Sequence, residues 1–222
     1  MSINIEKLYA LATENLECLC WGYAKENSMG SGAEFFERVK QDPRTFARYY
    51  PALAAALEIW ETSREEVLRA KNGSAYAAVK RVIKSAKNSI RNVHGYWIDS
   101  EERQCFCDGY RAIRLKKHMD GFDAVEGINL DNLMTVDGEP TELQLPTIGE
   151  LKACIAEQKG RSQKRYDFGD GLPLVNPEYL RDMMEIFPNA AVKSYGINRP
   201  IIFESDAGDG LMLPIHKGRK EV

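Results

Sequence analysis

The chain has 222 residues, of which 44% are hydrophobic and 28% charged, and its formal net charge is −3. This composition is typical of a chain that buries a core in one or two domains, and it argues against a disordered tail. The longest apolar runs are far shorter than the ~18 residues of a membrane span. The first residues lack the basic start and apolar stretch of a secretory signal. We therefore expect a soluble, cytoplasmic protein with no membrane partner.

The first third of the chain shows the period of an α-helix. Apolar residues recur at three- and four-residue steps between Ile5 and Leu19. An Asn-, Ser- and Gly-rich stretch over 27–32 interrupts the pattern, and a second helix is predicted over 33–40. Asp42 and Pro43 are the N-cap and first residue of a third helix.

Pro51 lies early enough in this third helix to kink or restart it. Its aromatic and aliphatic stripe, from Phe46 to Leu68, is assigned to the core. The residues over 71–74 form a plausible linker. The sequence therefore predicts a helical N-terminal region over 1–72, followed by a second domain over 73–222.

Five cysteines occur, at positions 18, 20, 105, 107 and 154. An odd number without a secretory signal argues against a disulfide framework. The two C-x-C pairs offer four thiolates, but paired zinc ligands are usually separated by two to four residues. The pattern favours buried free thiols over a metal site, so we expect no cofactor.

The charge is unevenly distributed. Residues 69–117 contain 12 Lys and Arg against 4 Asp and Glu, whereas the segments on both sides are net acidic. A concentrated basic block is typical of proteins that bind a polyanion. The other interpretation is that these cations balance acidic neighbours within the same fold.

A helix predicted over 75–91 carries part of this block. Lys80, Lys84, Lys87 and Arg91 follow the spacing i, i+4, i+7, i+11, which places them within about 60° of one another around the helix. Like charges at i, i+4 repel by a few tenths of a kcal/mol. The row therefore suggests an anionic partner that offsets this repulsion.

Short strands follow, over 95–98, 104–107 and 110–115, with a tight Asp108–Gly109 turn before the third. Residues 118–164 form an irregular segment that ends in a helix with a capping box at Thr147 and Glu150. Asn176 and Pro177 begin another helix. Three further strands are predicted over 191–195, 200–204 and 211–215, the last two joined by a loop over 205–210.

Three stretches together resemble the bacterial sliding clamp, the beta subunit of DNA polymerase III. The first contains an Asp-Gly-x-Arg-x-Ala motif, the second opens a helix, and the third is a C-terminal apolar–Pro–apolar segment. The matching residues are Asp108, Gly109, Arg111, Ala112, Asn176, Tyr179, Leu180, Met184, Leu213, Pro214 and Ile215. Cys107 and Tyr110 stand where the family has threonine and histidine. The likeness covers residues 75–117 and 165–216.

The resemblance implies an α+β domain in which two helices pack on one face of an antiparallel sheet. It gives Lys80, Lys84, Lys87 and Arg91 a role facing the DNA phosphates without reading sequence. Residues Gly109, Tyr110, Arg111, Leu213, Pro214 and Ile215 match positions near the pocket that binds partner peptides. In the family the two halves of that pocket come from different domains, so in a single-domain chain we expect them to meet only if copies pack head to tail. The alternative is that these residues only hold a hairpin turn and a last strand.

The chain also departs from the family. A bacterial clamp chain has three such domains, whereas this chain has room for one. Residues 118–164 resemble an insertion, and the N-terminal helices have no counterpart. Encircling DNA would therefore require a homo-oligomer.

Three functions are compatible with the sequence. The first is a non-catalytic DNA-associated protein that contacts the backbone of duplex DNA with a clamp-like, processivity-type fold. The second is a protein–protein interaction or inhibitor module that uses a clamp-like fold without binding DNA. It would bind or block a replication or repair protein with its N-terminal helices.

The third function is enzymatic. Phosphate-binding glycine loops, zinc-protease motifs and serine-hydrolase motifs are missing from the sequence. Three histidines lack a neighbouring nucleophile pattern, and only Asp167 and Asp170 suggest a metal-dependent nuclease. We expect a protein that is not an enzyme.

Overall fold

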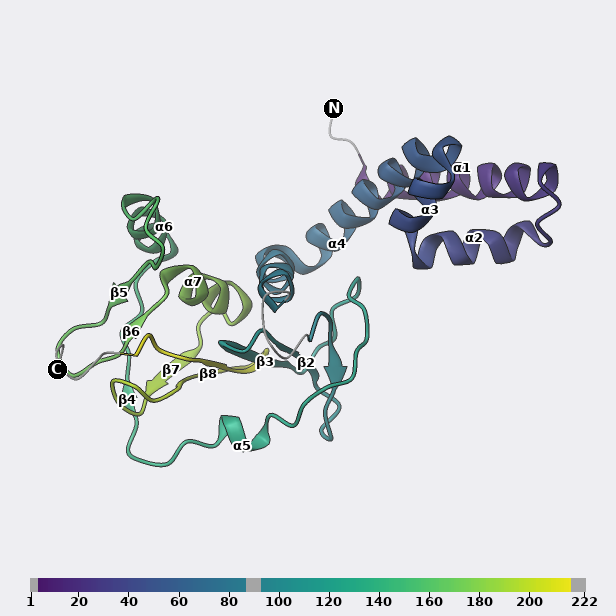
Figure 1. Cartoon of the computed structure of the whole chain (residues 1–222). Coiled ribbons are helices and arrows are strands. Elements are labelled where there is room, and N and C mark those ends of the chain that lie inside the picture. Colours follow the sequence, from purple (N-terminus) through teal and green to yellow (C-terminus); the bar gives the residue numbers. More distant parts are fainter. Residues whose placement is uncertain (1–3, 87–92, 217–222) are drawn as a thin grey trace. The chain divides into compact units, whose positions relative to one another are not determined.

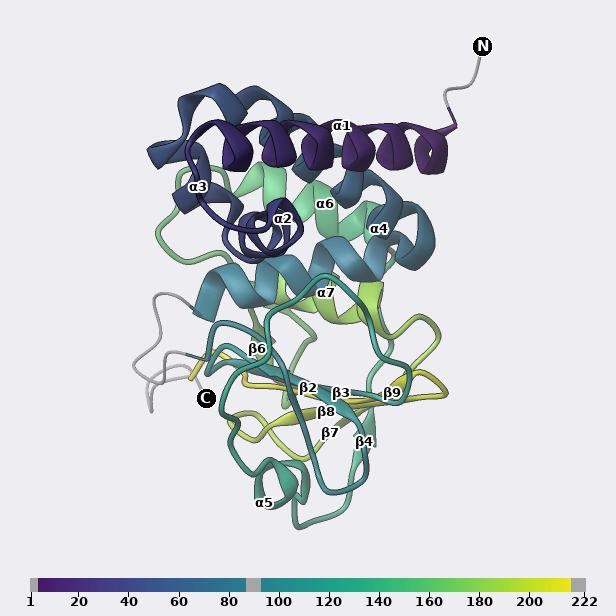
Figure 2. The ribbon, with the colours of Figure 1, turned by 90° about the vertical axis from the view of Figure 1, so that its right-hand side faces the viewer.

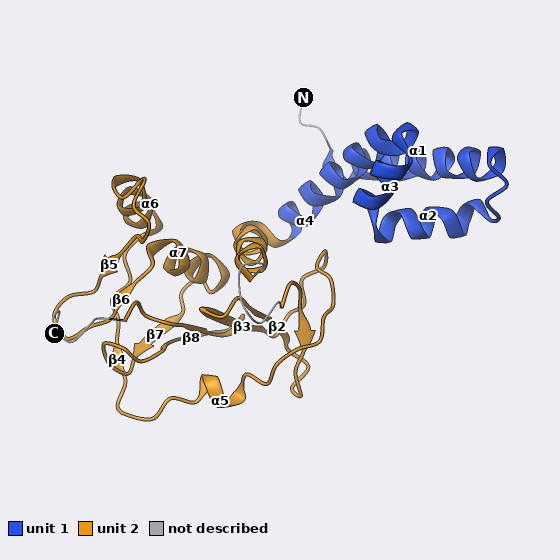
Figure 3. Ribbon diagram, viewed as in Figure 1, with its two compact units in different colours: residues 1–71 blue, residues 72–222 orange. Residues whose placement is uncertain are grey.

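The computed structural model describes residues 4–86 and 93–216 (Figure 1). The chain forms two compact units, residues 1–71 and 72–222, shown in different colours in Figure 3. The boundary lies one residue from the predicted one. Among the described helices, none is both long and apolar enough to cross a lipid bilayer.

The first unit is helical. It contains α1 (Ile5–Glu26), α2 (Gly32–Gln41), α3 (Pro43–Tyr49) and the first part of α4 (Pro51–Ala86). The Asp42 side chain accepts a hydrogen bond from the Thr45 amide, and α4 restarts at Pro51, as predicted. Because proline supplies no amide hydrogen, it begins a helix more readily than it continues one.

The core of the first unit takes its side chains from all four helices. Leu16, Phe35, Leu53 and Trp60 are buried at its centre. The predicted core stripe is wrong for Tyr49, which is 69% exposed. Three leucines of the predicted apolar pattern, Leu8, Leu11 and Leu19, also remain exposed.

Helix α4 contains one residue with non-helical backbone angles. Gly73 has φ 63° and ψ −148°, at the position of the predicted linker. Glycine adopts this conformation because it has no Cβ. The helix predicted over 75–91 is therefore the second part of α4, which the structure describes as far as Ala86; Lys87 and Arg91 lie outside the described residues.

Within the described residues, seven antiparallel strands form one sheet in the second unit. Their order across the sheet is β1 (Trp97–Ile98), β2 (Gln104–Cys107), β3 (Arg111–Leu115), β9 (Gly208–Met212), β8 (Ile201–Ser205), β7 (Ala191–Ser194) and β4 (Thr141–Glu142). A separate ribbon pairs β5 (Tyr166–Asp167) with β6 (Leu174–Val175).

Two helices pack on one face of the sheet. They are the second part of α4 and α7 (Pro177–Ile186), which Figure 2 shows on the same side of the strands. Val79 of α4 and Met183 of α7 share a core with Phe106 and Ile113 of the sheet. The second unit is thus an α+β domain of mixed helices and antiparallel strands, as predicted.

Residues 118–164 contribute to one edge of the sheet and cover its second face. Its short helix α5 (Asp131–Met134) and the residues around it cover the second face, where Leu130 packs with Trp97 and Cys105. Strand β4 adds the last strand to the sheet, and α6 (Ile148–Glu157) begins with the predicted capping box. Both faces of the central strands are therefore buried, so their sequence lacks an alternating pattern.

The predicted loop over 205–210 is shorter than expected. Strands β8 and β9 pair from Ser205 opposite Gly208, so only Asp206 and Ala207 form the turn. Gly208 has φ +146°, and a Cβ at this position would lie 2.0 Å from the Arg114 carbonyl oxygen. Glycine is needed here because two backbones approach closely. Strand β9 begins at Gly208, three residues earlier than Leu211, where the apolar run marked it in the sequence.

We predict that Gly208→Ala destabilises the second unit by about 2 kcal/mol more than Gly138→Ala. Both glycines have positive φ, but a Cβ on Gly138 would have nothing within 4 Å. The difference between the two variants therefore isolates the close approach of β9 to β3. Urea unfolding measures it, and equal losses of stability would contradict the explanation.

Candidate DNA and partner interfaces

The turn between β2 and β3 is held by the Asp108 side chain. Its Oδ1 accepts hydrogen bonds from the amides of Tyr110 (2.9 Å) and Arg111 (2.7 Å). Gly109 has φ +88°, a conformation that favours glycine. The Asp108–Gly109 pair thus forms a tight turn, as predicted, and projects the Tyr110 side chain outward.

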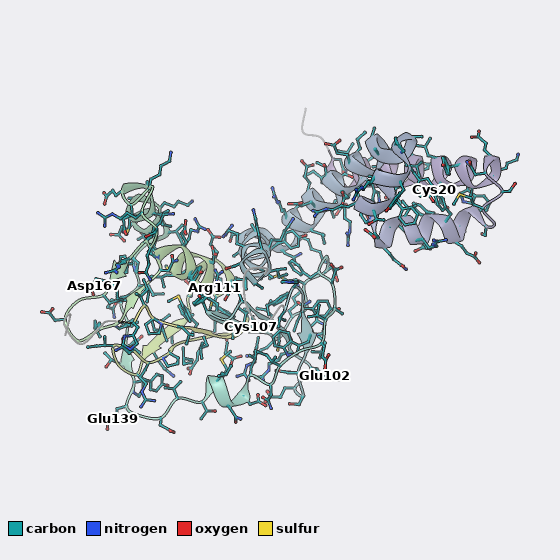
Figure 4. The ribbon with its side chains drawn as sticks, in the orientation of Figure 1. Cys20, Glu102, Cys107, Arg111, Glu139 and Asp167 are labelled. Atoms are coloured by element: carbon teal, nitrogen blue, oxygen red, sulfur yellow. The ribbon has the colours of Figure 1, made fainter. Side chains whose placement is uncertain are left out.

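Arg111 is buried below this turn. Its guanidinium donates to Asp108 (2.6 Å) and to Asp182 of α7 (2.6 Å), and its Cζ lies 4.1 Å from the centre of the Tyr179 ring. Only 2% of the residue is exposed, and Figure 4 marks its position between α7 and the sheet. A buried arginine is tolerated because two carboxylates and an aromatic face compensate for its lost hydration.

The same network extends to α4. Asp182 also accepts from Arg81 of α4 (2.7 Å) and from Arg181 (3.0 Å), and Arg81 pairs in addition with Glu185. Burial lowers the pKa of Arg81, but the two carboxylates outweigh this effect and hold that pKa above its ordinary value. The turn, α7 and α4 are therefore joined by one set of charges, which we call the buried ionic network.

No sequence motif marks Arg81, Asp182 or Glu185 as functional residues. The α7 segment contains Glu178, Asp182 and Glu185 against the single cation Arg181. The available signal was that these acidic residues are opposite in charge to Arg81, which lies beside the lysine row on α4.

The predicted partner-binding residues divide into two groups. Gly109 and Tyr110 lie at the surface beside Leu213, whose amide donates to the Tyr110 carbonyl (2.8 Å). Tyr110 is 55% exposed and Leu213 39%, and the half-buried Pro214 and Ile215 continue the same segment. Because β3 pairs with β9, a single chain brings both halves of the predicted surface together.

Arg111 does not lie on this surface. It is enclosed in the buried ionic network, so its side chain positions the turn instead of offering a contact to a partner. We call the exposed set of Tyr110, Leu213, Pro214 and Ile215 the turn surface. Tyr179 supports it from α7, with its ring centre 5.8 Å from that of Tyr110.

The predicted DNA-binding row is described in part. Lys84 is exposed, and Lys80 is half-buried with its Nζ 5.8 Å from the centre of the Tyr76 ring. Lys87 and Arg91 lie outside the described residues. In the described half of the row, Lys84 thus lies at the surface of α4 and Lys80 is partly covered.

Most arginines of the basic block are neutralised within the fold. Besides Arg81 and Arg111, Arg103 pairs with Asp99 (2.7 Å), and Arg114 pairs with Asp131 (3.0 Å) and Asp209. The interpretation of internal balance therefore holds for these four arginines. Lys84, Lys116 and Lys117 of the same block are exposed.

The cysteines are all free thiols. Cys105 and Cys107 share one face of β2, as predicted, but Cys18 and Cys20 lie in α1, where the strand argument does not apply. Burial raises the pKa of the Cys20 thiol to about 11 and that of Cys105 to about 12. Over the residues that the structure describes, no group of three or more metal-ligating side chains occurs.

The residues that suggested an enzyme are scattered. Asp167 and Asp170 are both exposed, the first on β5 and the second in the turn that follows it. His118 contacts the carbonyl of Glu102 (2.8 Å), and His94 is half-buried.

Comparison with known proteins adds no relative: no family, no curated protein and no solved structure matches this chain. The resemblance to sliding clamps therefore stays a prediction from sequence.

We predict that Arg111→Leu destabilises the second unit by about 3–5 kcal/mol, because Asp108 is left buried without a cation and Asp182 keeps only Arg81 and Arg181. Lys193→Leu serves as the control, since it removes a solvent-exposed pair with Glu204 and should cost far less stability than Arg111→Leu. Chemical denaturation measures both. Equal effects would mean that the buried ionic network does not stabilise the fold.

Thiol labelling tests the cysteine environments. At about pH 8 Cys18 should react quickly with a thiolate-specific reagent, while Cys20 and Cys105 react only on unfolding, since the thiolate is the nucleophile and burial disfavours it. Peptide mass spectrometry identifies the labelled residues. Rapid native labelling of Cys105 would contradict its placement beneath the α5 segment.

Proposed function

We propose that this chain is a non-catalytic DNA-associated protein whose second unit contacts the phosphate backbone of duplex DNA through the lysine row of α4. The observation that carries the proposal is the division of charge on this helix. Arg81 is held internally by Asp182 and Glu185, whereas Lys84, three residues further on, is exposed.

This division is supported by the chemistry of the two cations. Arginine suits buried pairs, because its planar guanidinium donates several hydrogen bonds in fixed directions. Lysine offers a mobile charge that can follow a phosphate backbone without reading bases. Since Arg81 of α4 and Arg181 of α7 are already paired with carboxylates, the lysines of α4 carry the DNA-binding proposal.

DNA binding of this kind depends strongly on salt. Four phosphate contacts predict a slope of about −3 to −4 for log affinity against log salt concentration. Lys84→Glu/Lys87→Glu should weaken binding by at least about tenfold for every duplex sequence and reduce the slope by about 2. Fluorescence anisotropy with several unrelated duplexes measures both quantities.

The matched control is Lys152→Glu/Lys159→Glu. These lysines lie in and just after α6 and are exposed, so the variant has the same net charge as the α4 variant. It should bind DNA nearly as well as the unchanged protein. A wild-type protein without measurable affinity for any duplex at about 50 mM salt would remove the proposal.

The turn surface favours a second function, a protein–protein interaction module. Exposed Tyr110 and Leu213 lie side by side on a rigid turn, and aromatic side chains are enriched where proteins bind one another. On this proposal a replication or repair protein binds the turn surface and DNA is not required.

Leu213→Asp separates the two functions. If the second function holds, Leu213→Asp loses a protein partner that both the unchanged protein and Lys84→Glu/Lys87→Glu retain. If the first function holds, Lys84→Glu/Lys87→Glu loses DNA affinity and Leu213→Asp retains it. Affinity capture and DNA titration of the same three proteins give the answer. A partner lost equally from both variants would contradict a role for the turn surface.

A further inference from the structure

The helical unit leaves one apolar groove uncovered. It lies between α1 and α4 and has a volume of about 370 Å³. Leu11 is 54% exposed and Ile59 57%, and both line the groove. The remaining lining residues are Leu8, Ala12, Asn15 and Ala56. We call this feature the α1–α4 groove.

Helix α1 therefore has two apolar sides. One contains Ala12, Leu16 and Cys20 and packs in the core of the unit. The other contains Leu8 and Leu11, which are three positions apart and therefore lie on the same face of the helix. The sequence pattern predicts that this second side is apolar, yet its leucines remain exposed in the structure.

Charges beside the groove indicate what covers it. Lys7 and Glu14 lie next to the two leucines, on the side of α1 away from α4 by the helix period, and both are exposed. Within the described residues neither forms an ion pair. Seven residues separate them, so they occupy equivalent positions in successive heptads.

The charges of Lys7 and Glu14 complement each other when two copies of α1 pair antiparallel. When a second α1 lies antiparallel with its Leu11 opposite Leu8, Lys7 faces Glu14 of the second copy, and Glu14 faces Lys7 of that copy. Shifting the pairing by one heptad places Leu11 opposite Asn15 and Glu14 opposite Glu14. The charges therefore select one two-fold arrangement and oppose its neighbour.

We propose that a second copy of this chain occupies the α1–α4 groove and forms a two-fold symmetric dimer through α1. Ile59 of each copy then lies on the other side of the α1 pair, where the two α4 helices approach. The inference does not depend on DNA binding. Its consequence is that two second units, each with its own lysine row and turn surface, are carried by one particle.

The experiment is sedimentation equilibrium of the full-length chain. Wild type should be a dimer at about 100 µM, and Leu11→Asp a monomer, because a carboxylate is placed in the apolar contact. Tyr49→Asp is the control, since Tyr49 is exposed in the same unit but does not line the groove. This variant should remain a dimer.

Charge exchange provides the second arm. Lys7→Glu and Glu14→Lys should each weaken the dimer by about tenfold, since each creates two like-charge contacts, and Lys7→Glu/Glu14→Lys should restore it. Circular dichroism verifies that each variant keeps its helices. A monomeric wild type, or a double variant no tighter than the single ones, would overturn the proposal and leave the groove to a different partner.

Discussion

The second unit depends on the pairing of Arg111 with Asp108 and Asp182. A buried guanidinium is costly unless its charge and its hydrogen bonds are satisfied, and here the two carboxylates come from different elements, a turn and a helix. Their geometry fixes the β2–β3 turn against α7, and Arg81 extends the same constraint to α4. Both candidate interfaces are thus attached to one set of buried charges.

These ion pairs change how the basic segment, residues 69–117, is interpreted. A local excess of cations in the sequence suggested a polyanion partner, yet four of its arginines meet carboxylates that lie far away along the chain or across a turn. The exposed cations beyond these arginines include Lys84, Lys116 and Lys117. The proposed DNA contact therefore depends on fewer cations than the sequence count indicates, and these cations can be named individually.

Local signals predicted much of the fold. The caps at Asp42, Thr147 and Asn176 and the turn at Asp108–Gly109 are decided by neighbouring residues, and the structure has them where the sequence placed them. The pairing of Arg111 with Asp182, 71 residues apart, has no local signal. The early start of β9 was missed for a similar reason, because Gly208 is selected by the backbone of β3 and not by its neighbours.

The most direct test of the account is the reactivity of individual lysines toward an amine-modifying reagent, compared with and without duplex DNA. The account predicts that DNA protects Lys84 and leaves Lys152 and Lys159 as reactive as before, with the buried ionic network intact in both states. Equal reactivity of Lys84 in the presence and absence of saturating DNA would contradict it.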